Sequence, residues 1–216
     1  MNPKDTYKHQ GLRKKLVQEI SLKGINDKLV LDAIEKIPRH TFIDSSFLEF
    51  AYQDKPFPIG DGQTISQPYT VAFQTQLLQI KKGTKILEIG TGSGYQACVL
   101  IEMGAKVFTI ERIKNLYIKT KSFLNSIGYN PKMFYGDGYK GLPAYAPFDG
   151  IIVTAGAPYI PEDLIKQLKV GGILVIPVND GDIQIMTTIT KISETNIEKK
   201  QWGSFRFVPL LGNKEF

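Results

Sequence analysis

Five short β-like runs alternate with segments long enough for helices between residues 84 and 177, and this alternation constrains the fold most. The runs lie at 85–89, 106–110, 132–135, 150–153 and 173–176. Strands separated by crossover helices pair in parallel, and their largely apolar sequences indicate burial on both faces. The pattern therefore predicts an α/β fold with a parallel sheet and helices on both faces.

Two further strand-like runs follow, Ile183–Ile192 and roughly Trp202–Pro209, joined by a turn at 193–196. A link this short requires the two strands to be antiparallel. We expect Trp202 and the aromatic residues Phe205 and Phe207 to pack against the sheet. The seven runs together predict a mostly parallel seven-stranded sheet.

The first 60 residues have a different pattern. Leu12, Leu16 and Ile20 recur every four residues, which is typical of a helix. A second helix is expected after Asn26 or Asp27 and before Pro38, followed by an aromatic-rich stretch without periodicity. We expect residues 1–60 to wrap around the core and residues 61–216 to form one compact catalytic domain.

A glycine-rich turn, Glu88–Gly94, follows the first strand directly and precedes a helix-like segment. Such a turn presents free backbone N–H groups at the carboxyl edge of a parallel sheet, where ligands bind. It lacks the Gly-Lys-Ser/Thr of a phosphate loop, and Tyr95 is too large for the dinucleotide fingerprint. A carboxylate at Glu88 would repel pyrophosphate and attract a cationic ligand. A tight turn without a ligand is the alternative.

Two later acids are expected at the tips of the next two strands. Glu111 lies 21 residues after Gly90, where a carboxylate can accept both hydrogen bonds of a ribose diol. Asp137, between two glycines, can accept a hydrogen bond from an adenine amino group. A surface glutamate and a simple turn are the alternative interpretations. The three loops follow the order that a bound nucleoside such as S-adenosylmethionine requires.

The sequence resembles the protein-L-isoaspartate O-methyltransferase family from about residue 12 to residue 211. The segments that carry the resemblance are GDGQTISQPY (60–69), ILEIGTGSGY (86–95), FDGIIVTA (148–155) and FRFVPL (205–210). Two loops depart from the family pattern: Gly156 stands where alanine is usual, and Pro177–Gly181 differs from Pro-Val-Gly. These departures affect the expected rim of the site more than its chemistry.

The resemblance implies a Rossmann-like S-adenosylmethionine-dependent methyltransferase fold whose last two strands are interchanged relative to most methyltransferases. It also implies methyl transfer to the free α-carboxylate of L-isoaspartyl (or D-aspartyl) residues in damaged proteins and peptides. The products are S-adenosyl-L-homocysteine and a methyl ester, from which repair proceeds through a succinimide. The α-carboxylate is ionised at pH 7, so the reaction needs positioning more than a strong general base.

The resemblance also implies the roles of individual residues. Ser66 is the expected catalytic residue, donating a hydrogen bond that orients the carboxylate, although Ser66 could instead cap a helix that begins near Pro68. Other substrate contacts are expected from Thr154, Val208 and Pro209. The expected cofactor contacts are Thr64, Ile65, Glu88, Gly90, Thr91, Gly92, Ser93, Gly94, Glu111, Arg112, Asp137 and Gly138. Gln184 is a weaker candidate near the ligand.

Composition limits the partners and the compartment. His9 and His40 are far apart in sequence and Cys98 is the only cysteine, so we expect neither a metal site nor a disulfide. No apolar run approaches the ~20 residues of a membrane helix, and the N-terminus is polar. The net charge of +6 comes from scattered lysines. We expect a cytoplasmic monomer that binds isoaspartyl proteins and peptides but neither nucleic acid nor membrane.

Three other functions remain open at this point. A nucleic-acid base methyltransferase would carry an aromatic residue in an Asn/Asp-Pro-Pro-Tyr-like loop after the fourth strand, but residues 153–158 read VTAGAP. A metal-dependent small-molecule methyltransferase would need an acid cluster that the sequence does not display. A methyltransferase-like fold retained as a binding module is the third, because a fold alone does not determine function.

Overall fold

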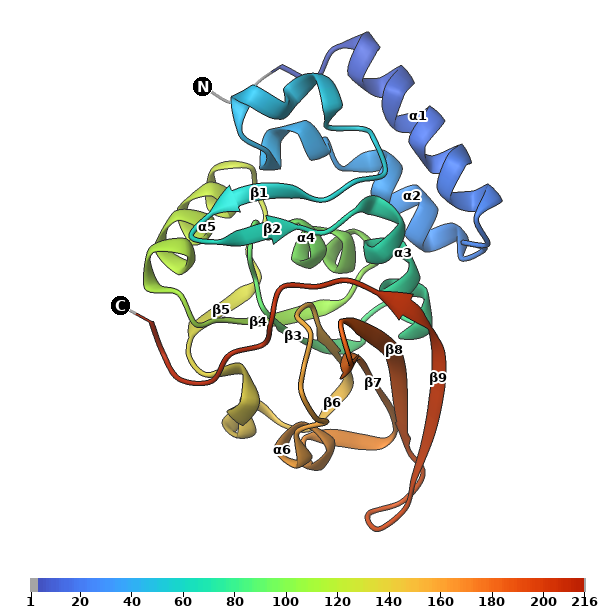
Figure 1. The fold of residues 1–216 in the computed structure, drawn as a ribbon, viewed down its shortest axis with the longest axis vertical. Coiled ribbons are helices and arrows are strands. Elements are labelled where there is room, and N and C mark those ends of the chain that lie inside the picture. Colours follow the sequence, from blue (N-terminus) through green and yellow to red (C-terminus); the bar gives the residue numbers. More distant parts are fainter. Residues whose placement is uncertain (1–3, 216) are drawn as a thin grey trace.

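The computed structural model describes residues 4–215, so the first three residues of the polar N-terminus lie outside it. Its centre is a seven-stranded sheet with the order β5-β4-β3-β6-β7-β8-β9 (Figure 1). The first five are parallel, and β8 runs antiparallel to both of its neighbours, β7 and β9. The strands are β3 (Lys85–Ile89), β4 (Lys106–Glu111), β5 (Lys132–Tyr135), β6 (Phe148–Val153), β7 (Leu168–Asp180), β8 (Ile183–Lys191) and β9 (Ile197–Phe205). The predicted fold class is confirmed, and the last strands follow one another in sequential order.

The last strand differs from the prediction. It was expected at about Trp202–Pro209 but covers Ile197–Phe205, and the chain then leaves the sheet. The N–H of Phe207 donates to the side-chain Oε1 of Gln184 (2.8 Å) instead of to a neighbouring strand, and Pro209 has no N–H to donate. The early part of β9 is exposed on both faces, so its sequence does not show the alternation of a half-buried strand.

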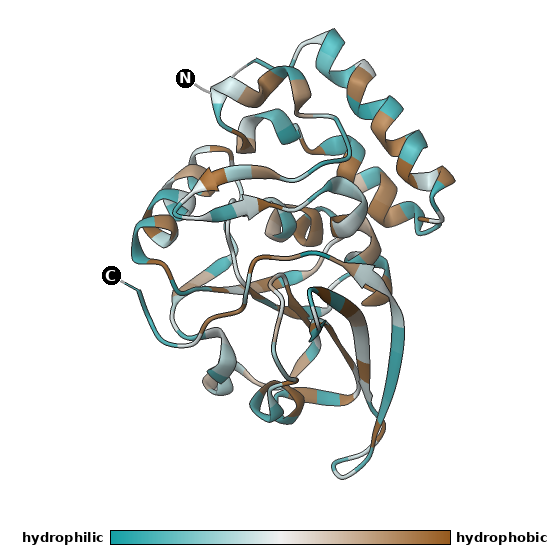
Figure 2. Ribbon diagram, in the orientation of Figure 1, coloured by the Kyte–Doolittle hydropathy of each residue, from teal (hydrophilic) through white to brown (hydrophobic). Residues whose placement is uncertain are grey.

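Alternate side chains of each central strand enter two separate cores. Ile86, Val107 and Ile152 face a large core covered by helices α3 (Pro68–Leu77), α4 (Tyr95–Glu102) and α5 (Lys114–Ser126). Leu87, Phe108 and their equivalents face a smaller core covered by α6 (Glu162–Lys166) and the 3₁₀ turns η3 (Gly138–Lys140) and η4 (Pro143–Tyr145). The central strands are accordingly hydrophobic in Figure 2, whereas β9 is largely hydrophilic.

The N-terminal segment packs into the larger core. It comprises α1 (Tyr7–Leu22), α2 (Lys28–Lys36) and the 3₁₀ turns η1 (Arg39–Phe42) and η2 (Ser45–Phe50). Asp27 caps α2 by accepting from two backbone N–H groups, and Ile37 before Pro38 is extended, as expected. The hairpin of β1 (Phe57–Gly60) and β2 (Gln63–Ile65) follows and lies between these helices and the sheet (Figure 1). The predicted boundary between residues 60 and 61 therefore falls at the turn of this hairpin. The division of the chain into a wrapping segment and a catalytic domain stays a prediction.

One buried cation connects the N-terminal segment to the sheet. The Arg39 side chain is 1% exposed, and its guanidinium lies 5.1 Å from the ring centre of Tyr95 at the start of α4. One guanidinium nitrogen donates to the carbonyl oxygen of Lys55 (3.2 Å). Burial lowers the pKa of Arg39 to about 10, so the group stays charged at neutral pH. The cation–π contact partly offsets the cost of burying this charge.

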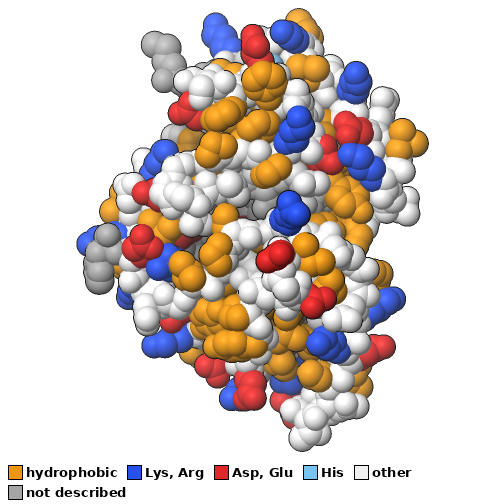
Figure 3. Space-filling model, viewed as in Figure 1, with side chains coloured by type: hydrophobic (Ala, Val, Ile, Leu, Met, Phe, Trp, Pro, Cys, Tyr) orange, Lys and Arg blue, Asp and Glu red, His pale blue; other side chains and the backbone are white. Residues whose placement is uncertain are grey.

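Among residues 4–215, no helix is both long and apolar enough to cross a membrane. Basic and acidic side chains are interspersed over the face drawn in Figure 3, consistent with the scattered lysines of the sequence.

Candidate active site

A cleft lies over the carboxyl ends of β3, β4 and β6, bounded on its far side by β2. Most of the predicted site residues line it: Thr64, Ile65, Ser66, Gly90, Thr91, Gly92, Ser93, Glu111, Arg112, Gly138, Thr154, Val208 and Pro209. Residues separated by up to about 140 positions in the sequence therefore meet at one edge of the sheet, as expected for an open α/β fold.

The glycine turn forms the floor of the cleft. Gly90 has φ +95°, and a β-carbon there would lie 2.6 Å from Oγ1 of Thr154. Gly92 has φ +54°, and its N–H donates to the Glu111 carboxylate (2.9 Å). Both positions need glycine because of backbone conformation, and Gly90 also because of a close contact. Gly94 caps α4 and packs against Leu124, outside the lining of the cleft.

Glu111 is the best-anchored acid of the cleft. Its side chain is almost fully buried, one carboxylate oxygen accepts from the N–H of Gly92, and the other accepts from the N–H of Ile113 (3.0 Å). Each carboxylate oxygen has two acceptor sites, so capacity remains for the two hydroxyl groups of a ribose. The backbone thus orients Glu111 before any ligand arrives.

Asp137 is held by two backbone N–H groups, and its expected contact with adenine stays a prediction. One carboxylate oxygen accepts from the N–H of Tyr139 (2.9 Å) and the other from the N–H of Asn213 (3.1 Å). Asp137 therefore caps the short helix η3 and holds the C-terminal segment, while the neighbouring Gly138 lines the cleft. A β-carbon at Gly138 would lie 2.4 Å from Ile89, so this glycine allows the loop to approach the sheet.

The expectation for Glu88 is corrected by its surroundings. Its side chain is fully buried behind the glycine turn, where Oε2 accepts from the hydroxyl of Thr109 (2.6 Å) and Oε1 has no partner among the described residues. Burial raises its pKa to about 8, opposed in part by the Thr109 hydrogen bond. A group that is mostly neutral at pH 7 and absent from the cleft lining does not attract a cation as expected.

Ser66 marks the other end of the cleft. It follows β2, is half-buried, and lines both the cleft and a smaller pocket beside it. Its hydroxyl makes no hydrogen bond to another described residue. The alternative role as a helix cap is not realised, because Gln67 is the N-cap residue of α3 and makes no side-chain cap hydrogen bond. The Ser66 hydroxyl is thus available to a ligand.

The smaller pocket, hereafter the acceptor pocket, is lined by Pro56, Thr64, Ser66, Gln67, Thr70, Thr154, Arg206, Phe207 and Val208. The Thr154 hydroxyl donates to the carbonyl oxygen of Gly90 (2.7 Å), which leaves it free only to accept. The carbonyl oxygen of Val208 accepts from the N–H of Gly156 (2.8 Å), which fixes one wall. Gln184 positions Phe207 from behind and does not line the pocket.

The C-terminal segment closes the cleft near Arg112. The guanidinium of Arg112 pairs with Glu215 (2.6 Å) and donates to the carbonyl oxygen of Asn213 (3.3 Å). Asn115 holds the tip of the β1–β2 hairpin through the carboxylate of Asp61 (3.1 Å). Arg112 therefore both lines the cleft and attaches the end of the chain to it.

Eleven residues of the cleft lining were not predicted, among them Gln74, Gln96 and Tyr95. Gln74 donates to the carbonyl oxygen of Val153 (2.9 Å), and Gln96 donates to the hydroxyl of Thr75 (2.9 Å). Tyr95 reaches the cleft from the start of α4. Gln74 and Gln96 are polar residues within apolar helical runs, which was the signal that could have identified them.

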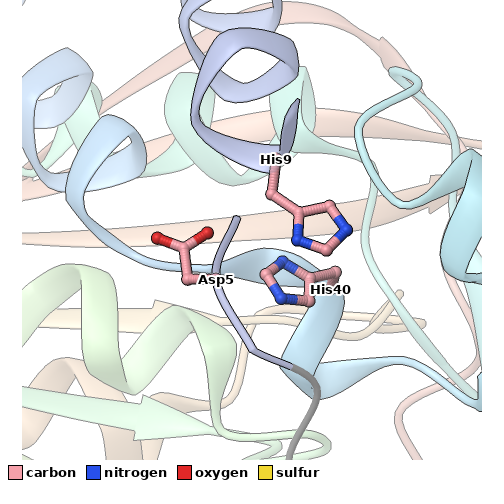
Figure 4. Close-up of side chains that lie close together, drawn as sticks. All are labelled: Asp5, His9 and His40. Atoms are coloured by element: carbon pink, nitrogen blue, oxygen red, sulfur yellow. The ribbon is translucent and has the colours of Figure 1, made fainter. Parts of the chain in front are cut away.

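The two histidines, which the sequence separates, stack in the N-terminal segment (Figure 4). The ring centres of His9 and His40 are 3.9 Å apart, and their nitrogens lie within 4.8 Å of the Asp5 carboxylate. Distance in sequence was therefore a poor reason to exclude a shared site. Both oxygens of Asp5 accept from Arg13 (3.0 Å each), so the carboxylate is already neutralised by a cation. The prediction that the chain has no metal stays a prediction.

Comparisons with known proteins agree with this geometry. The family model described as protein-L-isoaspartate(D-aspartate) O-methyltransferase matches residues 11–215. A protein named protein-L-isoaspartate O-methyltransferase from Christiangramia forsetii is 62% identical over 212 residues, which covers 98% of this chain and 99% of the relative. One of the same name from Flavobacterium johnsoniae is also 62% identical, with the same coverage.

A solved structure has the same fold. It is described as a protein-L-isoaspartate O-methyltransferase from Plasmodium falciparum in complex with S-adenosyl-L-homocysteine. The two chains are 28% identical and superpose with a TM-score of 0.82 over 93% of this chain and 99% of the other. The match of sequence and fold over nearly the whole length places this chain in the protein-L-isoaspartate(D-aspartate) O-methyltransferase family.

Proposed function

We propose that this protein transfers a methyl group from S-adenosylmethionine to the free α-carboxylate of L-isoaspartyl residues in damaged proteins and peptides. One observation carries the proposal. In a chain of this family, the cleft joins an anchored Glu111 at one end to a Ser66 hydroxyl that has no hydrogen-bond partner within residues 4–215 at the other. The first suits a nucleoside and the second suits an anionic acceptor.

The residues present fit the nucleoside. The glycine turn provides a floor that a side chain would fill, and Glu111 retains acceptor capacity for the ribose. Ile110, Gly138 and Leu210 provide apolar and backbone surface for the adenine. When bound, S-adenosylmethionine supplies an electrophilic methyl group, and S-adenosyl-L-homocysteine is the by-product.

The acceptor pocket performs the remaining tasks of positioning and exclusion of water. The substrate carboxylate is ionised at neutral pH, so no residue has to remove a proton from it. Ser66 donates a hydrogen bond that holds the carboxylate beside the cofactor. Val208 presents a wall of the pocket to the extended substrate backbone, and Pro209 continues this wall in the adjoining cleft. Thr154 contributes an acceptor oxygen. Correct placement of the reacting atoms accounts for much of the rate enhancement in such a reaction.

The product is a methyl ester, which is a better acyl group for attack by the neighbouring backbone nitrogen than the carboxylate was. Attack by that nitrogen closes a succinimide with release of methanol, and its hydrolysis restores part of the normal linkage. The protein's contribution to repair thus ends with the ester. We further propose that it acts as a monomer in the cytoplasm, without nucleic acid or membrane as partner.

The direct test is methyl transfer from labelled S-adenosylmethionine to matched peptides that differ only in one aspartyl or isoaspartyl linkage. The expected result is label on the isoaspartyl peptide alone, released by mild base as volatile methanol because it is held as an ester. Equal labelling of both peptides would refute the proposal. So would stable label on RNA, DNA or a small molecule.

A further inference from the structure

A second groove continues from the acceptor pocket along the edge of the sheet. It runs between α3 and β9, and its lining shares Pro56, Gln67, Thr70 and Arg206 with that pocket. The acceptor pocket in turn shares Thr64, Ser66, Thr154 and Val208 with the cofactor cleft. The three cavities therefore adjoin one another, and the groove lies next to the substrate side of the cleft.

The groove is lined by an aromatic cluster: Tyr69, Phe73, Trp202 and Phe205. The ring centre of Phe73 lies 5.1 Å from that of Phe205 and 6.5 Å from that of Trp202. Trp202 and Phe205 were expected simply to pack against the sheet, yet Trp202 is 43% exposed. Exposed aromatic surface in a concave site favours contact with apolar or aromatic side chains.

The shape of β9 creates this exposure. Its pairing with β8 shifts between Ile185 and Thr187, where the β9 partners are Ser204 and Gln201, so β9 carries an extra residue. Such a bulge redirects the side chains next to it. The indole N–H of Trp202 donates to the hydroxyl of Thr188 (3.1 Å), which holds the ring in this orientation.

Arg206 stands where the groove meets the acceptor pocket. Its side chain is exposed, and its guanidinium makes no hydrogen bond or ion pair with another described residue. A free cation at this junction is complementary to an anionic acceptor in the neighbouring pocket. The groove therefore offers apolar surface at a fixed distance from a positive charge.

We propose that this groove binds an apolar or aromatic side chain of the substrate polypeptide close to the isoaspartyl residue, while Arg206 attracts the isoaspartyl carboxylate. The inference rests on the proposed function. Trp202 and Arg206 are four residues apart, which corresponds to at most roughly 13 Å of extended chain at ~3.3 Å per residue. An extended substrate would therefore place a side chain about two to four residues from the isoaspartyl position over the aromatic cluster.

The test uses isoaspartyl peptides of equal length that contain no tryptophan. Each peptide carries either phenylalanine or serine at one position, two to four residues before or after the isoaspartyl residue. The KM of the best phenylalanine peptide is expected to be about tenfold lower than that of its serine counterpart. Trp202→Ala is expected to reduce this ratio to near one. Tyr7→Ala removes an aromatic side chain that is 91% exposed and remote from the groove, so it should keep the ratio.

Arg206→Gln tests the role of the positive charge separately from that of the aromatic cluster. It is expected to raise the KM of phenylalanine and serine peptides by similar factors, with a larger effect at low salt, because it removes a charge and not an apolar contact. The protein has a single tryptophan, so the emission of Trp202 reports directly on the groove of the unmodified chain. Phenylalanine peptides should shift this emission in the presence of S-adenosyl-L-homocysteine, and serine peptides should not.

These experiments distinguish a failure of the groove proposal from a failure of the proposed function. Methylation of every isoaspartyl peptide with equal KM, and no change in Trp202 emission, would overturn the inference alone. Emission that changes with protein concentration instead of peptide would mean that a second copy covers the groove, and would also overturn it. Failure to methylate any isoaspartyl peptide would overturn the proposed function and this inference together.

Discussion

The two ends of the cleft differ in how far the protein completes them by itself. At the cofactor end, the carboxylates of Glu111 and Asp137 each accept two backbone hydrogen bonds. At the acceptor end, the hydroxyl of Ser66 and the guanidinium of Arg206 have no hydrogen-bond partner among the described residues. One end is fixed by the chain, and the other is left to be completed by the substrate.

This difference matches what each end has to recognise. A single cofactor is best held by groups that are already oriented, because little conformational freedom is then lost on binding. An acceptor embedded in many different polypeptides is better met by a few free polar groups beside an open groove. Changes at the cofactor end should therefore act on cofactor affinity, and changes at the acceptor end should act on turnover and on peptide KM.

The largest expected effect is at Glu111. Glu111→Ala removes two charge-assisted hydrogen bonds to the glycine turn and its flank, together with the ribose contact. The Kd for S-adenosyl-L-homocysteine, measured by calorimetry, is expected to rise about a hundredfold or more. Glu198→Ala, on the exposed part of β9, is the matched control. An unchanged Kd in Glu111→Ala would show that the cofactor end of the cleft does not depend on Glu111.

Ser66 should affect turnover and not cofactor affinity. Ser66→Ala removes a hydroxyl donor offered to the substrate carboxylate, so kcat is expected to fall by about tenfold or more. The Kd for S-adenosyl-L-homocysteine should stay the same. Ser122→Ala, on the exposed face of α5, controls for the loss of a hydroxyl elsewhere. A variant with wild-type kcat would remove Ser66 from the catalytic site.

Glu88 is buried behind the glycine turn of the cofactor end, and its titration should change the free energy of unfolding. Its pKa is raised to about 8 in the folded protein, so the folded state holds a proton that the unfolded chain releases above its ordinary pKa of 4.5. Stability should therefore fall between about pH 5 and pH 8, by a few kcal/mol at most. Glu88→Gln should lose this dependence, as measured by urea unfolding at several pH values. Parallel pH profiles of both proteins would contradict the expected titration.

The smallest effect is expected at Gly156, in the loop after β6. Gly156→Ala places a β-carbon 2.9 Å from Cγ of Gln184, the residue whose amide oxygen holds Phe207. Adjustment of this side chain should cost about 1 kcal/mol and lower the Tm by roughly 2–4 °C. The peptide KM should rise slightly while the cofactor Kd stays constant. A rise in the cofactor Kd would contradict this prediction, because it would show that a change at the acceptor end also alters cofactor binding.

The sequence predicted the framework and the anchored end better than the open end. Strand alternation and the glycine turn placed Glu111 correctly, because a residue at a parallel strand tip must reach the same edge. Spacing could not show that Glu88 points into the core, because that depends on which face of β3 meets α4. Nor could it show that His9 stacks on His40, or that Arg206 stays unpaired, since both depend on tertiary packing of segments distant in sequence.

The account is tested most directly by a crystal structure of the protein with S-adenosyl-L-homocysteine and an isoaspartyl peptide. It predicts the ribose hydroxyl groups on the Glu111 carboxylate and the cofactor sulfur facing the acceptor pocket. The peptide carboxylate should lie between that sulfur and the Ser66 hydroxyl. A nucleoside bound away from Glu111, or a peptide carboxylate on the far side of the cleft from Ser66, would contradict it.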